Sequence, residues 1–278
     1  MGSFRSTDII LGALQFKPEF LKVEENLRKI SKMVRKFEGD ILVLPELAFS
    51  GYLFKDEEEL FRASEWNETI FDEMKNLSKS KNMVIVFGFA ERSDDGFYNS
   101  CSVVLPNGST FLYRKTHLFH REKLFFLPGN TGFMVVEYEG MRIGSAICFD
   151  WFFPESFRTL AILGADVIAH CANLVMPYCQ NASVYRALEN RIYIATANRW
   201  GIERNGSDEL RFTGMSQIVS PKGEVLVRAN EEGDVIISSK VDLNLSRDKR
   251  LNEFNDVMKD RREMMYFRGR KYKEDEKD

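Results

Sequence analysis

One cysteine lies where an expected buried strand gives way to an expected helix. Cys148 directly follows the run 142–147, which alternates and then becomes apolar, and Pro154 opens an amphipathic helical run shortly after it. In such a turn, backbone N–H groups point towards a bound group and the helix dipole favours a thiolate. The position suits a nucleophile, although most free cysteines are small buried apolar side chains. Position alone does not decide between the two.

A carboxylate and an ammonium stand at comparable points of the chain. Glu46 directly follows the apolar segment ILVLP, and Lys115 ends the expected strand STFLYRK. Ligands of open α/β sheets gather outside the carboxyl ends of strands. There Glu46 could take the thiol proton of Cys148, the thiolate could attack, and Lys115 could hold the oxyanion that forms. A capping glutamate, a surface lysine and a core cysteine are the alternative, because spacing alone does not show that the three meet.

The sequence offers little to a metal ion. His117 and His120 are three residues apart, but no further cluster of carboxylate, His or Cys side chains completes a ligand set. The four cysteines have neither the spacing of a zinc site nor a secretory context that would favour disulfides. We therefore expect no metal.

The composition is typical of a soluble globular protein. The 278 residues are 44% hydrophobic and 29% charged, with a formal net charge of −3. This charge argues against a nucleic-acid partner, since no basic surplus exists to meet phosphates. No apolar run approaches the length of a membrane span, and the amino terminus lacks a signal-peptide core. We expect a cytoplasmic protein that binds neither nucleic acid nor membrane.

Hydrophobic periodicity divides the chain into two halves with a similar order of elements. The first half contains expected strands at 9–16, 41–44, 83–90, 98–105 and 110–114 and helices at 24–37 and 64–80. The second contains strands at 133–138, 141–147, 166–170, 192–197 and, as a closing meander, 215–219, 224–228 and 235–241, with helices after Pro154 and at 182–191. Two mixed sheets packed face to face, each covered outside by two helices, would bury both kinds of strand. The expected fold is therefore α/β, a four-layer α-β-β-α sandwich.

The chain becomes polar and charged after Asp242, yet it keeps too many apolar residues for a free tail. These are Leu251, Phe254, Met258, Met264, Met265, Tyr266 and Phe267. We expect one domain over 1–242 and a C-terminal arm over 243–278 that continues it. The arm would dock on the body or on a second subunit.

Several segments carry a resemblance to a known family. They are LVLPELAFSGY, YRKTHLF followed by REKLFFLPG, ICFDWFFPE, NRWGIER and FTGMSQIVSPKGEVL. In this order they resemble the signature segments of the nitrilase superfamily of carbon–nitrogen hydrolases. The chain most resembles archaeal thermophile nitrilases, and next the carbamoylputrescine amidases. The resemblance implies the same sandwich fold and a homodimer or a higher even-numbered homo-oligomer.

The resemblance also implies a role for each matching residue. Glu46 would be the general base, Lys115 the oxyanion cation and Cys148 the nucleophile, while Glu122 would position substrate and support Lys115. The backbone N–H of Phe149 would share the oxyanion hole. The reaction would pass through a thioester on the cysteine, and no metal or organic cofactor would be needed.

The segment after the cysteine bears on the substrate. Trp151 and the two phenylalanines that follow it stand where some relatives place an arginine for a substrate carboxylate. A small apolar, neutral or cationic substrate is therefore expected, although Trp151 is equally suited to the core. Tyr52, Asn173 and Trp200 are further pocket candidates by position.

The expected function is hydrolysis of a small nitrile or amide to a carboxylic acid and ammonia. Hydrolysis of an N-carbamoyl amine is an alternative within the same chemistry. A subunit that supplies ammonia to a separate partner, and a binding protein without catalysis, are alternatives of other classes. The complete Glu–Lys–Cys set argues against the binding protein.

Overall fold

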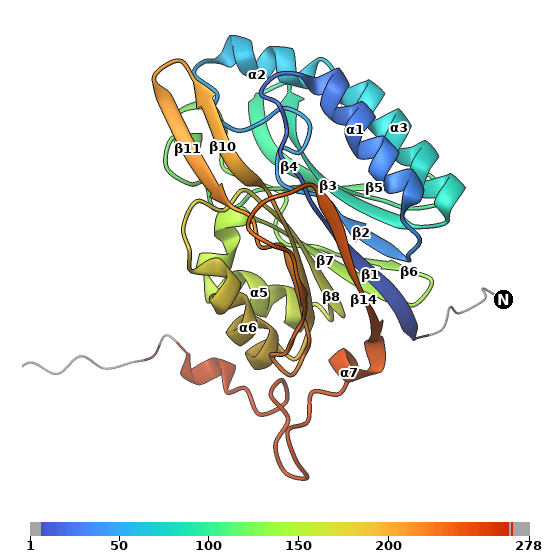
Figure 1. Ribbon diagram of the computed structural model, residues 1–278. Coiled ribbons are helices and arrows are strands. Elements are labelled where there is room, and N and C mark those ends of the chain that lie inside the picture. Colours follow the sequence, from blue (N-terminus) through green and yellow to red (C-terminus); the bar gives the residue numbers. More distant parts are fainter. Residues whose placement is uncertain (1–6, 267, 269–278) are drawn as a thin grey trace, which may run out of the picture.

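The computed structural model describes residues 7–266 and 268. Its strands form two six-stranded sheets and one two-stranded hairpin. The two large sheets pack face to face, with helices α1 (Val23–Lys36) and α3 (Asn67–Lys81) outside one, and α5 (Pro154–Ile162) and α6 (Cys179–Asn190) outside the other (Figure 1). The predicted α-β-β-α sandwich of two mixed sheets is confirmed.

The first sheet has the strand order β14-β1-β2-β3-β4-β5. Its members are β1 (Asp8–Gln15), β2 (Ile41–Val43), β3 (Val84–Ser93), β4 (Gly96–Val104), β5 (Thr110–Arg114) and β14 (Val235–Asp242). The strands β1, β2 and β3 run parallel, and β2 is buried on both faces, as its wholly apolar sequence predicted. Parallel pairing brings the carboxyl ends of β2 and β3 to one edge of the sheet.

The second sheet has the order β13-β12-β9-β8-β7-β6. Its members are β6 (Val135–Tyr138), β7 (Met141–Ile147), β8 (Val167–Ala172), β9 (Tyr193–Asn198), β12 (Gln217–Val219) and β13 (Val225–Arg228). The apolar faces of α5 and α6 cover it through buried side chains that include Phe157, Leu160 and Ala187. The carboxyl end of β7, where Cys148 follows, lies beside that of the parallel strand β8.

The last strand does not close a meander in the second sheet, and this part of the sequence prediction is wrong. β14 pairs antiparallel with β1 over eight residues, from Asp8 opposite Asp242 to Gln15 opposite Val235. The chain therefore returns to the first sheet, where β1 offered an unpaired edge. This pairing joins the two ends of the domain.

Several elements were not predicted. They are α2 (Glu57–Ser64), the hairpin of β10 (Trp200–Asn205) and β11 (Asp208–Thr213), and the short helices α4 (Glu122–Phe125), η1 (Cys148–Phe152), α7 (Leu243–Arg247) and η2 (Glu263–Met265). The hairpin strands contain adjacent charged residues and bury only Gly201, Glu203 and Phe212, so hydrophobic periodicity gave no signal for them.

The C-terminal arm docks on the body through part of its length. The Lys249 ammonium donates to the carbonyl oxygens of Asn190 and Arg191 at the end of α6, and Arg247 pairs with the buried Asp166 at 2.9 Å. Other apolar residues of the arm stay exposed: Leu251, Phe254, Met264, Met265 and Tyr266. Phe267 lies outside the described residues. Within the described ranges, no helix combines the length and apolar character needed to cross a membrane.

Candidate active site

Glu46 is buried in the turn after β2, tightly packed against β3. A Cβ atom on Gly88 would lie 2.5 Å from the Glu46 Cα, so only glycine allows this approach. Asn173 Nδ2 donates to the Glu46 carbonyl oxygen at 2.9 Å, and Asn99 Nδ2 donates to Glu46 Oε1 at 2.7 Å. Glu46 Oε2 is buried and has no hydrogen-bond partner in the described part of the chain. One carboxylate oxygen is thus fixed and the other can accept a proton.

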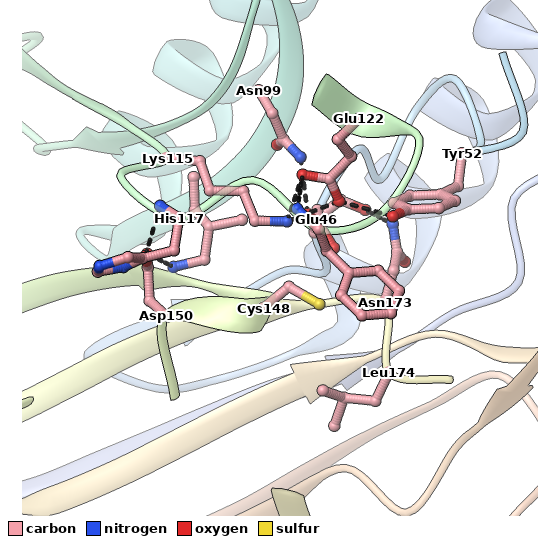
Figure 2. A network of polar contacts seen from close by, with 12 residues as sticks. Glu46, Tyr52, Asn99, Lys115, His117, Glu122, Cys148, Asp150, Asn173 and Leu174 are labelled. Carbon is pink, nitrogen blue, oxygen red and sulfur yellow. Dashed lines mark hydrogen bonds and ion pairs between the residues drawn. The ribbon is translucent and has the colours of Figure 1, made fainter. Parts of the chain in front are cut away.

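Lys115 directly follows β5, and its ammonium lies between two carboxylates (Figure 2). Lys115 Nζ is 2.6 Å from Glu46 Oε1 and 2.8 Å from each carboxylate oxygen of Glu122. Glu122, the first residue of α4, also accepts hydrogen bonds from the Tyr52 hydroxyl at 2.6 Å and the Phe119 backbone N–H at 3.2 Å. The structure therefore brings Glu46, Lys115 and Glu122 together in one buried cluster.

Cys148 directly follows β7 and is the first residue of the 3-10 helix η1. Its φ of +38° lies in the left-handed region, which is strained for a residue with a Cβ atom. His170 Nε2 lies 3.0 Å from the Cys148 carbonyl oxygen. The Cys148 sulfur points to the side of the site where Glu46 and Asn173 lie (Figure 2). The nucleophile candidate thus faces the charged cluster.

Burial controls protonation in the cluster. It raises the pKa of Glu46, and it raises the pKa of the Cys148 thiol well above its ordinary value, with the Glu46 charge adding to the effect on the thiol. Burial alone would lower the pKa of Lys115, but the charges of Glu122 and Glu46 outweigh it and hold that pKa above its ordinary value. The resting cysteine is therefore a neutral thiol beside an ammonium. The helix dipole that favours a thiolate in such a turn is outweighed here by the cost of burying the charge, so Glu46 must take the thiol proton before attack.

A cavity of about 10 Å³ lies next to Cys148. Its walls are mostly apolar and consist of Phe119, Phe149, Trp151, Asn173, Leu174, Val175 and Met176. A space of this size holds about one water molecule, so a substrate must displace side chains to enter. A groove of about 1050 Å³ runs along α1 and α3, but no predicted site residue lines it. The volume of a cavity therefore does not identify the active site in this molecule.

Four of the five pocket candidates lie at the site. Phe149, Trp151 and Asn173 line the cavity, and Tyr52 reaches Glu122. Trp200 does not line this cavity. Its indole N–H donates to Asp234 Oδ1 at 2.7 Å and the ring lies beneath the ammonium of Lys17, because the start of β10 directs this side chain to that loop.

Three buried polar residues near the cluster were missed. Asn99 fixes Glu46, Asp150 accepts hydrogen bonds from both sides of the site, and His170 contacts the Cys148 carbonyl. His170 interrupts a strand that is otherwise apolar, and a search for such interruptions would have found it. Asn99 gave no such signal, because its strand also contains Ser100 and Ser102. Among the described residues, no group of three or more His, Cys, Asp or Glu side chains is placed to hold a metal ion.

Comparison with known proteins places the chain in a family. A family model described as carbon-nitrogen hydrolase matches residues 10–250. The chain belongs to the carbon–nitrogen hydrolase family. It is an enzyme of the nitrilase superfamily, and the resemblance of its segments is confirmed.

Two relatives and one solved structure of this family illustrate the match. A nitrilase from Pyrococcus abyssi is 47% identical, with 92% of this chain and 98% of that protein covered. An (R)-stereoselective amidase from a Pseudomonas species is 35% identical over 82% of this chain and 81% of its own. The crystal structure of a carbon-nitrogen hydrolase from Helicobacter pylori has the same fold, with a TM-score of 0.84 and 22% identity over 93% of this chain and 97% of that one.

Proposed function

We propose that this carbon–nitrogen hydrolase converts a small neutral nitrile or amide to a carboxylic acid and ammonia, with Cys148 as its nucleophile. One observation carries the proposal: a buried ammonium lies 2.6 Å from Glu46 and 2.8 Å from Glu122, and the Cys148 thiol faces this cluster. The carboxylate, cation and thiol supply a base, an oxyanion partner and a nucleophile.

The first half-reaction with an amide forms a thioester. The free oxygen of Glu46 takes the thiol proton as Cys148 Sγ attacks the carbonyl carbon. The ammonium of Lys115 and the backbone N–H of Phe149 hold the oxyanion that forms. Glu46 then gives its proton to the leaving nitrogen, the carbon–nitrogen bond breaks, and ammonia departs.

The second half-reaction regenerates the cysteine. Glu46 removes a proton from water, which attacks the thioester and releases the acid, and the proton returns to the thiolate. With a nitrile, addition of the thiol across the triple bond gives a thioimidate, and water then displaces ammonia to give the same thioester. Glu122 fixes the Lys115 ammonium throughout, with the Tyr52 hydroxyl holding Glu122 in turn.

The cavity supports a neutral apolar acyl group. Of the residues that line it, Asn173 is polar and none carries a charge, so a substrate carboxylate would lack a bidentate cationic partner. The aromatic rings of Phe119, Phe149 and Trp151 offer apolar contact instead. An N-carbamoyl amine with a short chain would meet the same walls and is the second substrate class to test.

We also propose that the enzyme works as an even-numbered homo-oligomer in the cytoplasm. Exposed apolar side chains at the end of α5, on α6 and on the arm support self-association: Ile162, Leu163, Tyr185, Leu188, Phe254 and Met264. Cys101, Cys148, Cys171 and Cys179 are all free, as is usual in a reducing compartment, and this supports the cytoplasmic location. Light scattering of the purified protein tests the assembly, and a monomer at micromolar concentration would refute it.

Ammonia release from a small substrate panel tests the function. The panel holds aliphatic nitriles and dinitriles, simple amides, N-carbamoyl amines and glutamine, each with Cys148→Ala as the blank. Release of ammonia and acid from nitriles identifies a nitrilase, and release from amides or carbamoyl compounds alone identifies an amidase. A folded protein that releases none would contradict the proposal and favour an ammonia-supplying subunit that needs a partner.

A further inference from the structure

Asp150 is a buried carboxylate that belongs to neither the predicted triad nor the cavity wall. It accepts four hydrogen bonds from two separate segments of the chain. Its Oδ1 accepts from the backbone N–H of His117 at 3.2 Å and from His117 Nδ1 at 2.8 Å. Its Oδ2 accepts from the Tyr113 hydroxyl at 2.8 Å and from the backbone N–H of Ile147 at 2.9 Å.

We infer that Asp150 is a positioning residue that sets Lys115 and Cys148 relative to one another. The inference rests on the proposed function, because it concerns the geometry between the oxyanion cation and the nucleophile. Three of its four hydrogen bonds come from Tyr113 and His117, the residues two places before and two places after Lys115. The fourth comes from Ile147, which immediately precedes Cys148.

The places of Lys115 and Cys148 in the fold explain why Asp150 can set their relative position. Lys115 leaves the end of β5 and Cys148 leaves the end of β7, so the two residues come from different sheets. A single carboxylate oxygen, Asp150 Oδ2, accepts from both of these segments. The bonds are charge-assisted and buried, which makes them stronger than neutral ones. Asp150 therefore fixes one segment against the other at the place where the reacting groups meet.

Two contacts keep this arrangement from relaxing. The His117 ring stacks on Phe153 with a centroid separation of 3.7 Å and an interplanar angle of 12°, which holds His117 Nδ1 on the carboxylate. His170 Nε2 also contacts the Cys148 carbonyl oxygen at 3.0 Å. The strained backbone of Cys148 is therefore held before the residue by the Ile147–Asp150 hydrogen bond and after it by His170. Misplacement of a reacting group by about 1 Å can cost on the order of a hundredfold in rate.

Asp150→Asn tests the inference, and the chain offers a matched control. In asparagine an NH₂ group replaces one of the two carboxylate oxygens. This group cannot accept a hydrogen bond, so at least the two hydrogen bonds to that oxygen are lost. Asp166 is equally buried and ion-paired, with Arg142 at 2.6 Å and Arg247 at 2.9 Å. It precedes β8 at the end of the strand opposite the site, since Val167 pairs with Ile143 whereas Cys171 pairs with Ile147. Asp166→Asn therefore perturbs a buried carboxylate without touching the site.

Three quantities are measured below the unfolding temperature of each variant: kcat, KM and the rate at which iodoacetamide alkylates Cys148, located by peptide mass. We expect Asp150→Asn to lower kcat and the alkylation rate by on the order of tenfold to a hundredfold, with KM changed less than about twofold. Asp166→Asn should lower Tm but leave all three quantities near the wild-type values. The alkylation rate needs no substrate, so it tests Asp150 even if the proposed hydrolysis is refuted by the panel.

His117 provides a second pair of variants if Asp150→Asn does not fold. His117→Ala removes the Nδ1 donor, and His117→Asn replaces it with an amide N–H of similar reach. We expect the alanine variant to lose kcat and alkylation rate and the asparagine variant to recover most of both. Wild-type kcat and alkylation in Asp150→Asn, or in His117→Ala, would overturn the inference. An equal loss in Asp166→Asn would overturn it as well, because the effect would then be one of general stability.

Discussion

His170 should make the stability of the molecule depend on pH between 6.5 and 4. It lies on β8 with no exposed surface, and burial is the main reason that its pKa falls from an ordinary 6.5 to about 4. The Cys148 carbonyl can only accept, so His170 Nε2 carries the proton, and Nδ1 is left to accept from the Thr196 hydroxyl at 3.1 Å. The folded protein therefore holds a neutral imidazole in one tautomer.

The sign of the effect follows from the direction of the shift. Because the folded pKa is the lower one, the unfolded chain binds more protons between pH 6.5 and 4. The stability from this group is complete above pH 6.5 and is lost as the pH falls through that range. With these two pKa values, the loss at pH 4.5 relative to neutral pH is about 2.5 kcal/mol in the free energy of unfolding.

Urea unfolding at pH 7.5 and pH 4.5 measures this loss in the wild type and in His170→Gln. Glutamine offers an N–H and an oxygen of similar reach but does not titrate. Carboxylates destabilise both proteins in acid, so the difference between the two proteins isolates the histidine. We expect the wild type to lose about 2.5 kcal/mol more than the variant. An equal loss in both proteins would refute the argument that a buried neutral imidazole sits behind the cysteine.

Two further predictions concern the cluster itself. Lys115→Ala should lower kcat by about a hundredfold or more, since it removes an oxyanion donor; steady-state kinetics on the best panel substrate would measure this, and near-normal turnover would exclude the lysine from the oxyanion site. Gly88→Ala should lower the free energy of unfolding by about 2 kcal/mol, because its Cβ would lie 2.5 Å from the Glu46 Cα and 2.8 Å from the Leu47 nitrogen. Urea unfolding would measure that loss, and unchanged stability would show that the turn carrying Glu46 can yield.

Short local signals predicted the layers. The gathering of Glu46, Lys115 and Cys148 was predicted from the resemblance of the segments, because spacing alone does not show that the three residues meet. A wholly apolar strand such as 41–44 must be buried on both faces, and the polar residue that follows it emerges at the sheet edge. Lys115 follows β5, which pairs antiparallel with β4, and Cys148 follows a strand of the other sheet, so parallel pairing alone does not bring these residues to Glu46. The resemblance of the segments supplied Glu122, whose position in a short helix no periodicity indicates.

What the sequence did not predict depends on contacts between distant residues. Hydrophobic alternation makes β14 a strand but does not choose between β13 and β1 as its partner. Trp200 was a pocket candidate by its position in the chain, whereas its side chain contacts Lys17 and Asp234 on other loops. Helix α2 is a different case, because its signal was present in the local sequence and was overlooked. Asp56 is its N-cap, and the Asp56 side chain accepts a hydrogen bond from the Glu59 backbone N–H.

The charge balance of the cluster explains why a neutral thiol is compatible with attack. The Lys115 ammonium pairs with two carboxylates, those of Glu46 and Glu122, so the resting site has an excess of negative charge. This charge and the burial of the site both disfavour a thiolate at Cys148. In the proposed reaction the proton moves from the thiol to Glu46 as the oxyanion forms, and the negative charge moves from the Glu46 carboxylate to the substrate oxygen. The total charge beside Lys115 does not change. The same burial that raises the pKa of the thiol also raises that of Glu46, so the proton acceptor becomes stronger where the donor becomes weaker.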